Sequence, residues 1–311
     1  MSPRREKVEF RSYYDLPILN PPRWSALDIA GYLFTGGLAG ASSVLAAGAE
    51  VTGRPTLARA GKVAGLAAIG VSTVALIHDL GRPARFHHML RVVKPTSPMS
   101  IGTWILSTYG PLAGVAAGTS VTGLFPRLGR AATLGAGLTG PAVAAYTGVL
   151  LANTAVPAWH EAHGELPITF VGSAAAAAGG LGMIAAPVAE AGPARRLAVL
   201  GAAVETVSST ISERKMGIVA EAYHSGRAGK LLAAAKILTV GGALGAAVFG
   251  RSRLGAALSG AALLAGSACT RFGIFEAGLE SARDPRYTVV PQNERKAQRT
   301  ANSKITSSPG E

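Results

Sequence analysis

Long apolar stretches alternate with short polar connections along most of the chain. A helix needs about 20 mainly apolar residues to cross the hydrocarbon core of a bilayer. Stretches of roughly that length run over residues 27–49, 63–80, 101–121, 131–153, 168–189, 194–212, 230–250 and 254–276. Lipid offers backbone groups no hydrogen-bond partners, and the alternating pattern of barrel strands is absent. The pattern therefore predicts an all-α polytopic transmembrane bundle of about eight helices.

The two ends of the chain are more polar than the part between them. Residues 1–26 form a polar N-terminal tail and residues 277–311 a C-terminal tail, which leaves residues 27–276 as the transmembrane domain. The proline and β-branched residues of 282–291 favour an extended segment that contacts a partner, and the chain after Asn293 is expected to be disordered. The first apolar stretch is longer than the apolar region of a signal peptide, so we expect it to remain as the first span.

Composition supports a membrane protein and gives it an orientation. Only 15% of the residues are charged and 49% are hydrophobic, whereas soluble domains are about one-quarter charged. The net charge is +13, but the cations fall in clusters between apolar stretches, so we expect no nucleic-acid partner. Connections on the side of the termini carry about twice as many cations as the others. The positive-inside rule then predicts cytoplasmic termini in a multi-pass plasma-membrane protein.

Few residues are suited to bind a metal or a haem. Cys269 is the single cysteine, which excludes Cys-ligated iron–sulfur clusters and structural zinc sites within this chain. Of the six histidines, His78 alone touches a predicted span. A haem held between helices is therefore not expected, and we expect no metal bound by this chain.

Ionisable residues gather between the second and third stretches. The segment reads His78-Asp79-Leu80-Gly81-Arg82-Pro83-Ala84-Arg85-Phe86 and continues to Ser97-Pro98-Met99-Ser100-Ile101-Gly102. One interpretation is a basic loop whose arginines contact lipid head groups. Another follows from the place of Asp79 at the end of a span with arginines nearby, where burial and charge can tune a pKa for proton transfer.

This segment resembles the NrfD-like family, the membrane subunits of polysulfide reductases and related complexes. Residues 31–37, residues 146–151 and Trp159 support the resemblance, which covers about residues 24–290. It implies a subunit that binds a quinone, which we expect to be menaquinone, and anchors a four-cluster iron–sulfur protein. That partner in turn carries a molybdopterin catalytic subunit with molybdenum or tungsten. The chain would then be non-catalytic alone and pass electrons between the iron–sulfur partner and the quinone.

The resemblance and the residue chemistry together suggest a quinone site near the terminus-side ends of the helices. Tyr146 is the first candidate ligand, because similar proteins place a tyrosine of this kind on the quinone, and Asp79 with His78 is the candidate proton exchanger. Tyr32 and Arg82 are further candidates. The alternatives are a tyrosine of the interfacial belt for Tyr146 and ordinary helix packing for Tyr32.

Three more ionisable residues lie within apolar stretches: Glu205, Lys236 and Arg271. Such residues are costly in lipid unless they pair or line a wet path. Glu205 is therefore expected either to pair with Lys236 or Arg271 as a structural lock, or to form with them a proton path to the quinone. Lys236 can also extend its ammonium group towards the interface.

Several functions stay open at this point. A catalytic module docked in the cytoplasm favours formate as the electron donor, which suggests a formate dehydrogenase complex. Reduction of polysulfide or thiosulfate is the alternative within the same family. A secondary transporter that uses the three buried charges is a different class, against which stands the absence of an inverted sequence repeat. A structural anchor without a quinone site is the remaining possibility.

Overall fold

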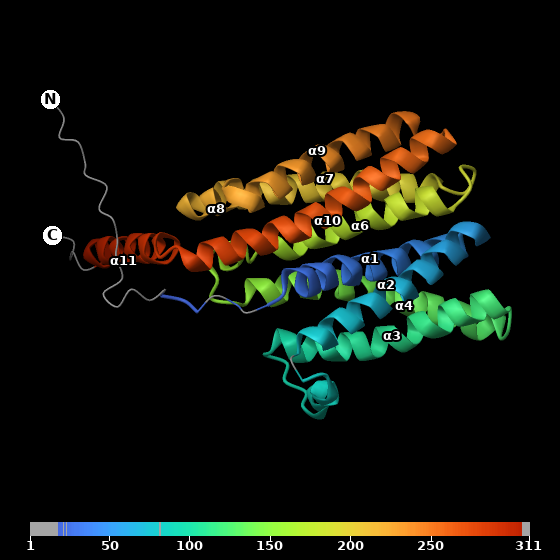
Figure 1. Cartoon of the computed structure of the whole chain (residues 1–311), viewed down its shortest axis with the longest axis horizontal. Coiled ribbons are helices and arrows are strands. Elements are labelled where there is room, and N and C mark those ends of the chain that lie inside the picture. Colours follow the sequence, from blue (N-terminus) through green and yellow to red (C-terminus); the bar gives the residue numbers. More distant parts are fainter. Residues whose placement is uncertain (1–17, 21, 23, 81, 307–311) are drawn as a thin grey trace.

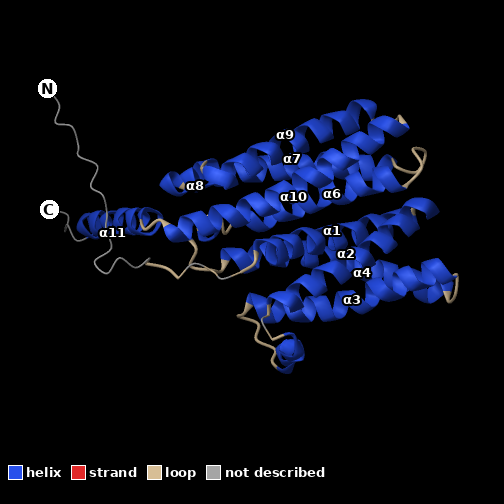
Figure 2. Cartoon of the chain, in the orientation of Figure 1, coloured by secondary structure: helices blue, strands red, loops and turns tan. Residues whose placement is uncertain are grey.

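The chain is described here from a computed structural model, which covers residues 18–20, 22, 24–80 and 82–306. In this part of the chain every regular element is a helix, and no strand is present (Figure 2). Nine of the described helices have 20 residues or more, and eight of them lie side by side. Two short helices and two 3-10 helices occupy the connections at the end where the chain begins. Helix α11, Arg286–Thr306, continues beyond that end of the bundle (Figure 1).

The first four long helices form one bundle. They are α1 (Ala26–Val51), α2 (Pro55–Asp79), α3 (Pro98–Thr122) and α4 (Pro126–Ala152), and the 3-10 helix η1 (Pro83–Arg91) lies between α2 and α3. Each helix contacts the next, and α4 returns to contact α1. Neighbouring helices run antiparallel (Figure 1), because two of the connections are only three residues long and the longer one, with η1, returns the chain at the same end.

The other four long helices form a second bundle with the same order of contacts. They are α6 (Leu166–Ala185), α7 (Gly192–Lys215), α9 (Gly226–Phe249) and α10 (Arg253–Arg283). Here too each helix contacts the next, and α10 returns to contact α6. The short helices α5 (Pro157–His160), η2 (Gly217–Ala220) and α8 (Glu221–His224) fill the connections at the terminus-side end. The chain thus repeats one arrangement of helices twice in the same orientation, which the sequence pattern did not reveal.

Close glycine contacts recur at equivalent places in the two bundles. A Cβ atom added to Gly40 in α1 would lie 2.3 Å from the carbonyl oxygen of Gly140 in α4. In the second bundle, one added to Gly180 in α6 would lie 2.7 Å from the carbonyl oxygen of Gly260 in α10. Helices in lipid gain stability from such close backbone approach, which explains why small residues lie at these crossings. The bundles meet mainly where α1 and α4 contact α6.

The long helices confirm an all-α polytopic bundle. Six of them are long and apolar enough to cross a membrane, namely α1, α2, α4, α6, α9 and α10. Helices α3 and α7 do not reach the same apolar level, yet they lie beside the others along the same direction (Figure 1). All eight coincide with the predicted apolar stretches within a few residues at most ends.

Two boundaries differ clearly from prediction. Helix α2 begins at Pro55 rather than residue 63 and therefore includes Lys62, which is largely buried. Its side chain is 9% exposed and its Nζ lies 2.7 Å from Glu50 Oε2, so the charge is compensated inside the bundle. The extended segment predicted for 282–291 is wrong, since these residues end α10 and begin α11. Good helix formers are concentrated from Glu294 onwards and explain the later part of α11, whereas residues 287–293 are mostly weak helix formers and include Pro291.

Candidate functional site

The predicted quinone ligand Tyr146 lies in the interior of the first bundle. Its side chain is 7% exposed, which argues against a place in the interfacial belt. Its ring lies against Gly102 of α3, where an added Cβ would come within 2.6 Å of the ring carbons. The Tyr32 ring of α1 is on another side, with 6.5 Å between the ring centroids. The structure therefore brings the two candidate tyrosines together.

The hydroxyl group of Tyr146 is buried and has no hydrogen-bond partner among the described residues. A buried O–H group without a partner loses its hydration without compensation, and most such groups in proteins are satisfied. A phenol is a donor that suits a carbonyl oxygen. The arrangement therefore fits a ligand that presents a carbonyl group to this side chain.

His78 and Asp79 lie at the end of α2 and hold the beginning of α1. The Nδ1 atom of His78 is 3.0 Å from Asp28 Oδ2, and the backbone N–H of Ser25 donates to Asp79 Oδ1 over 3.2 Å. Ser25 is also the N-cap of α1. These polar groups mark the terminus-side end of the first bundle, whereas Tyr32 lies seven residues after Ser25, a rise of about 10 Å.

Arg82 is exposed beyond the end of α2, and the structure shows no ion pair between its side chain and Asp79. The side chain of Arg85 lies outside the described residues. The structure thus places His78, Asp79 and Arg82 at one membrane face but gives Arg82 no described contact with the tyrosine pair.

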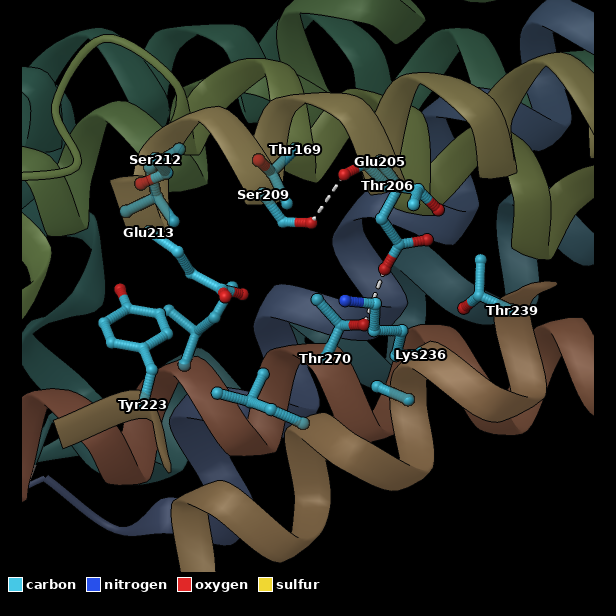
Figure 3. A pocket seen from close by; sticks show the side chains of 14 residues that line it. Thr169, Glu205, Thr206, Ser209, Ser212, Glu213, Tyr223, Lys236, Thr239 and Thr270 are labelled. Carbon is cyan, nitrogen blue, oxygen red and sulfur yellow. Dashed lines mark hydrogen bonds between the residues drawn. The ribbon is translucent and has the colours of Figure 1, made fainter. Parts of the chain in front are cut away.

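A polar cavity of ≈ 70 Å³ lies in the second bundle, between α6, α7, α9 and α10 (Figure 3). At the terminus-side end it is lined by Glu213 and Tyr223, and deeper in the bundle by Glu205, Thr239 and Thr270. Glu213 and Glu205 are eight residues apart on α7, so the cavity extends over roughly 12 Å along that helix. Hydroxyl groups of Thr169, Thr206, Ser209 and Ser212 line the part between them.

The inner end of this cavity is formed by a buried carboxyl group. Glu205 is 5% exposed, and its Oε1 accepts a hydrogen bond of 2.6 Å from the hydroxyl of Thr270. Its Oε2 is buried and has no partner among the described residues. Figure 3 shows the Lys236 side chain extending from α9 towards Thr270 and Glu205, although no ion pair joins these described residues.

Arg271 follows Thr270 on α10 and joins the two bundles. Its side chain is fully buried, and its Nη2 donates to the Phe170 carbonyl over 2.7 Å while its Nε donates to the Leu33 carbonyl over 3.4 Å. The guanidinium group also stacks 3.7 Å above the Phe170 ring, and its Nη1 has no partner among the described residues. Arg271 therefore contacts backbone groups of both bundles, in place of the predicted ion pair with Glu205.

At the mouth of the cavity, Glu213 Oε2 lies 3.5 Å from His224 Nε2. The Tyr223 hydroxyl donates to the Ala158 carbonyl over 3.0 Å, and burial followed by the nearby Glu213 charge raises the pKa of this phenol above its usual range. Sequence reasoning missed Glu213, His224 and Thr270. A spacing of eight residues between two glutamates on one helix, about two turns, was the available signal.

Comparison with known proteins supports the sequence resemblance. Residues 19–118 match the model of the polysulphide reductase family NrfD. This range contains Tyr32, His78, Asp79 and Arg82, while Tyr146 and the cavity of the second bundle lie outside it. No curated protein matches the chain. Residues 19–118 are therefore similar to the NrfD family, and the long apolar helices indicate a multi-pass membrane protein.

Proposed function

We propose that this chain is the quinone-reactive subunit of an iron–sulfur molybdoenzyme complex and passes electrons between a partner iron–sulfur protein and menaquinone. The observation that carries the proposal is the Tyr146 hydroxyl, which is buried in the first bundle and has no hydrogen-bond partner in the described part of the chain. The NrfD match supports it, because the family's members interact with quinones.

The residues around Tyr146 fit a quinone head group. The Tyr146 hydroxyl donates to one carbonyl oxygen, and the Tyr32 ring supplies an apolar wall beside it. A quinone bound here would supply two-electron, two-proton redox chemistry. Asp79 and His78 exchange protons with the aqueous side of the same bundle end, where both already contact polar groups.

The polar cavity of the second bundle offers a separate proton path. Protons enter beside Glu213 and pass along the hydroxyl-lined cavity to Glu205. Thr270, which donates a hydrogen bond to Glu205, is followed in sequence by Arg271. Arg271 donates to the carbonyl of Leu33 in α1, and Leu33 is the neighbour of Tyr32. Lys236 lines the same cavity.

Copurification tests the proposed place in a complex. Affinity purification of the chain in mild detergent is expected to yield an iron–sulfur protein and a molybdopterin subunit, with menaquinone in the organic extract. The catalytic module is expected on the cytoplasmic side, together with both termini. A chain that purifies alone, without quinone, and drives substrate uptake in vesicles would instead support a transporter.

A transporter gains one argument from the structure, since the two bundles repeat the same helix order. The four helices around the polar cavity are unbroken, however, unlike the interrupted helices of many transporters. The donor of the complex is tested by assay: we expect formate to reduce a menaquinone analogue. Turnover with polysulfide or thiosulfate, and none with formate, would identify the other type of complex.

A further inference from the structure

The α2–α3 connection and the two helices after it carry positive charge that no acidic residue of the same segment balances. No Asp or Glu occurs between Asp79 and Glu161, whereas Arg82, Arg85, Arg91 and Lys94 follow one another within 13 residues. Within the described ranges, no acidic side chain forms an ion pair with Arg91 or Lys94. These cations lie at the terminus-side end of the bundle, on and after η1, which projects from the ends of α2 and α3 (Figure 1).

The residues after η1 are held in a defined conformation against α3. The backbone N–H of Lys94 donates to Ser100 Oγ over 3.0 Å, and Ser100 Oγ donates to the Val92 carbonyl over 3.1 Å. The Trp104 indole N–H donates to the same carbonyl over 3.4 Å. The backbone of Lys94 is therefore fixed above the first turns of α3, and its ammonium group has no ion-pair partner among the described residues. Trp104 occupies the position of an interfacial tryptophan.

An apolar groove of ≈ 370 Å³ begins at this lysine and runs between α3 and α4. Beside Lys94, its walls include Trp104, Ile105 and Ala142. Two threonines also line it, but the Thr108 hydroxyl donates to the Trp104 carbonyl and the Thr139 hydroxyl to the Gly135 carbonyl. The groove therefore presents hydrocarbon along its length and one cation at its end, a distribution that matches an acyl chain below an anionic head group.

We propose that the groove between α3 and α4 binds an anionic phospholipid, with an acyl chain along Ile105 and Ala142 and the phosphate at Lys94. The charge of the segment selects an anionic over a zwitterionic lipid, because each cation near an anionic membrane surface adds about fivefold to binding. The site is separate from Tyr146 and does not depend on the proposed function. The proposed lipid site would also explain why helices α3 and α4 contain no Asp or Glu.

Native mass spectrometry of the purified complex tests the proposal, with phosphatidylglycerol and phosphatidylcholine as the added lipids. We expect one tightly retained phosphatidylglycerol and about fivefold weaker retention in Lys94→Gln. Lys230→Gln is the matched control, because Lys230 is exposed at the same end of the second bundle, and it should retain lipid like the parent protein.

A second variant tests the groove without changing the charge. Ala142 is exposed on α4, so Ala142→Phe is expected to leave the fold intact, fill the groove and reduce phosphatidylglycerol retention. Equal retention of both lipids, or of phosphatidylglycerol by the parent and Lys94→Gln, would overturn the proposal. Release of quinone instead of phospholipid by Ala142→Phe would also overturn it, since Ala142 lies one turn from Tyr146.

Discussion

Buried polar atoms without a protein partner are the features that most need a ligand or a proton to explain them. Tyr146, Glu205 and Arg271 each have such an atom within the described part of the chain. An unsatisfied buried group costs roughly 1–3 kcal/mol, and more when charged. Tyr109 shows the contrast, because its hydroxyl donates to the Ala39 carbonyl and also lies 2.7 Å from Ser43 Oγ. Tyr109 is thus satisfied by packing, whereas the other three side chains require something more.

Glu205→Gln separates a proton path from a structural lock. Glutamine keeps an oxygen that accepts the Thr270 hydrogen bond but cannot exchange a proton, so the proton path predicts turnover with quinone lowered by about 10²-fold or more. The melting temperature should stay close to that of the parent complex. Stopped-flow reduction and differential scanning fluorimetry measure the two effects. A strongly destabilised variant with normal turnover would favour the lock.

At the scale of elements, the connections are ordered by contacts with distant helices. Trp159 of α5 is fully buried, donates its indole N–H to the Ile274 carbonyl over 2.8 Å and stacks on Trp24. It thereby closes the terminus-side end between the two bundles. At the opposite end, Arg253 donates to three carbonyls near the end of α6, which lack partners within that helix.

Gly278→Ala is expected to disturb the packing of Trp159. A Cβ at this position would lie 1.9 Å from the Trp159 ring, and the rigid, buried indole has no room to move. Overpacking of this kind costs roughly 1–3 kcal/mol, so the melting temperature of the detergent-solubilised protein should fall. Gly70→Ala on α2 is the control, since nothing lies within 4 Å of its added Cβ. Equal melting temperatures of the two variants would contradict this packing.

Glu190 stabilises the beginning of α2 from the connection between α6 and α7. Its Oε2 accepts the Leu57 backbone N–H over 3.0 Å, and this hydrogen bond lowers the pKa of the carboxyl group below its usual range. The stabilisation is therefore complete above the unfolded pKa of about 4.3 and is lost as the pH falls through the folded value.

Glu190→Gln should accordingly melt at a lower temperature than the parent protein near neutral pH, with a difference that shrinks as the pH falls below about 4. Melting curves of both proteins over this range, in the same detergent, measure the difference. A gap that stays constant across the range would show that the carboxylate does not act through this hydrogen bond.

At the scale of the whole molecule, the long helices follow directly from the sequence because lipid requires continuous apolar stretches. The pairing of helices does not, since nearly uniform Ala and Gly faces carry little information about which neighbour they meet. The bundle repeat and the polar cavity between α6, α7, α9 and α10 therefore appeared only in the structure. Lys62 falls in a predicted connection because the sequence does not show that Glu50, on α1, compensates its charge.

The candidate site was predicted in part. The motif at the end of α2 and the resemblance identified His78, Asp79 and Tyr146 as candidates, and the structure shows that Tyr146 is buried beside Tyr32. The partner of Asp79 was not foreseen, because a backbone N–H leaves no mark in a sequence pattern. Glu205 lies in a cavity of the other bundle, away from Tyr146. The sequence could not predict this, because it depends on which helices are neighbours in space.

The central claim is that Tyr146 takes part in quinone chemistry within the complex. Its most direct test is the rate at which a menaquinone analogue reoxidises the partner's reduced iron–sulfur clusters, followed by electron paramagnetic resonance in the purified complex. Tyr146→Phe is expected to lower this rate at least about tenfold, the effect of losing one hydrogen bond of about 1.4 kcal/mol or more to the quinone. Tyr109→Phe, the buried control in the same bundle, should retain the parent rate. Equal rates for Tyr146→Phe and the parent complex would contradict the account.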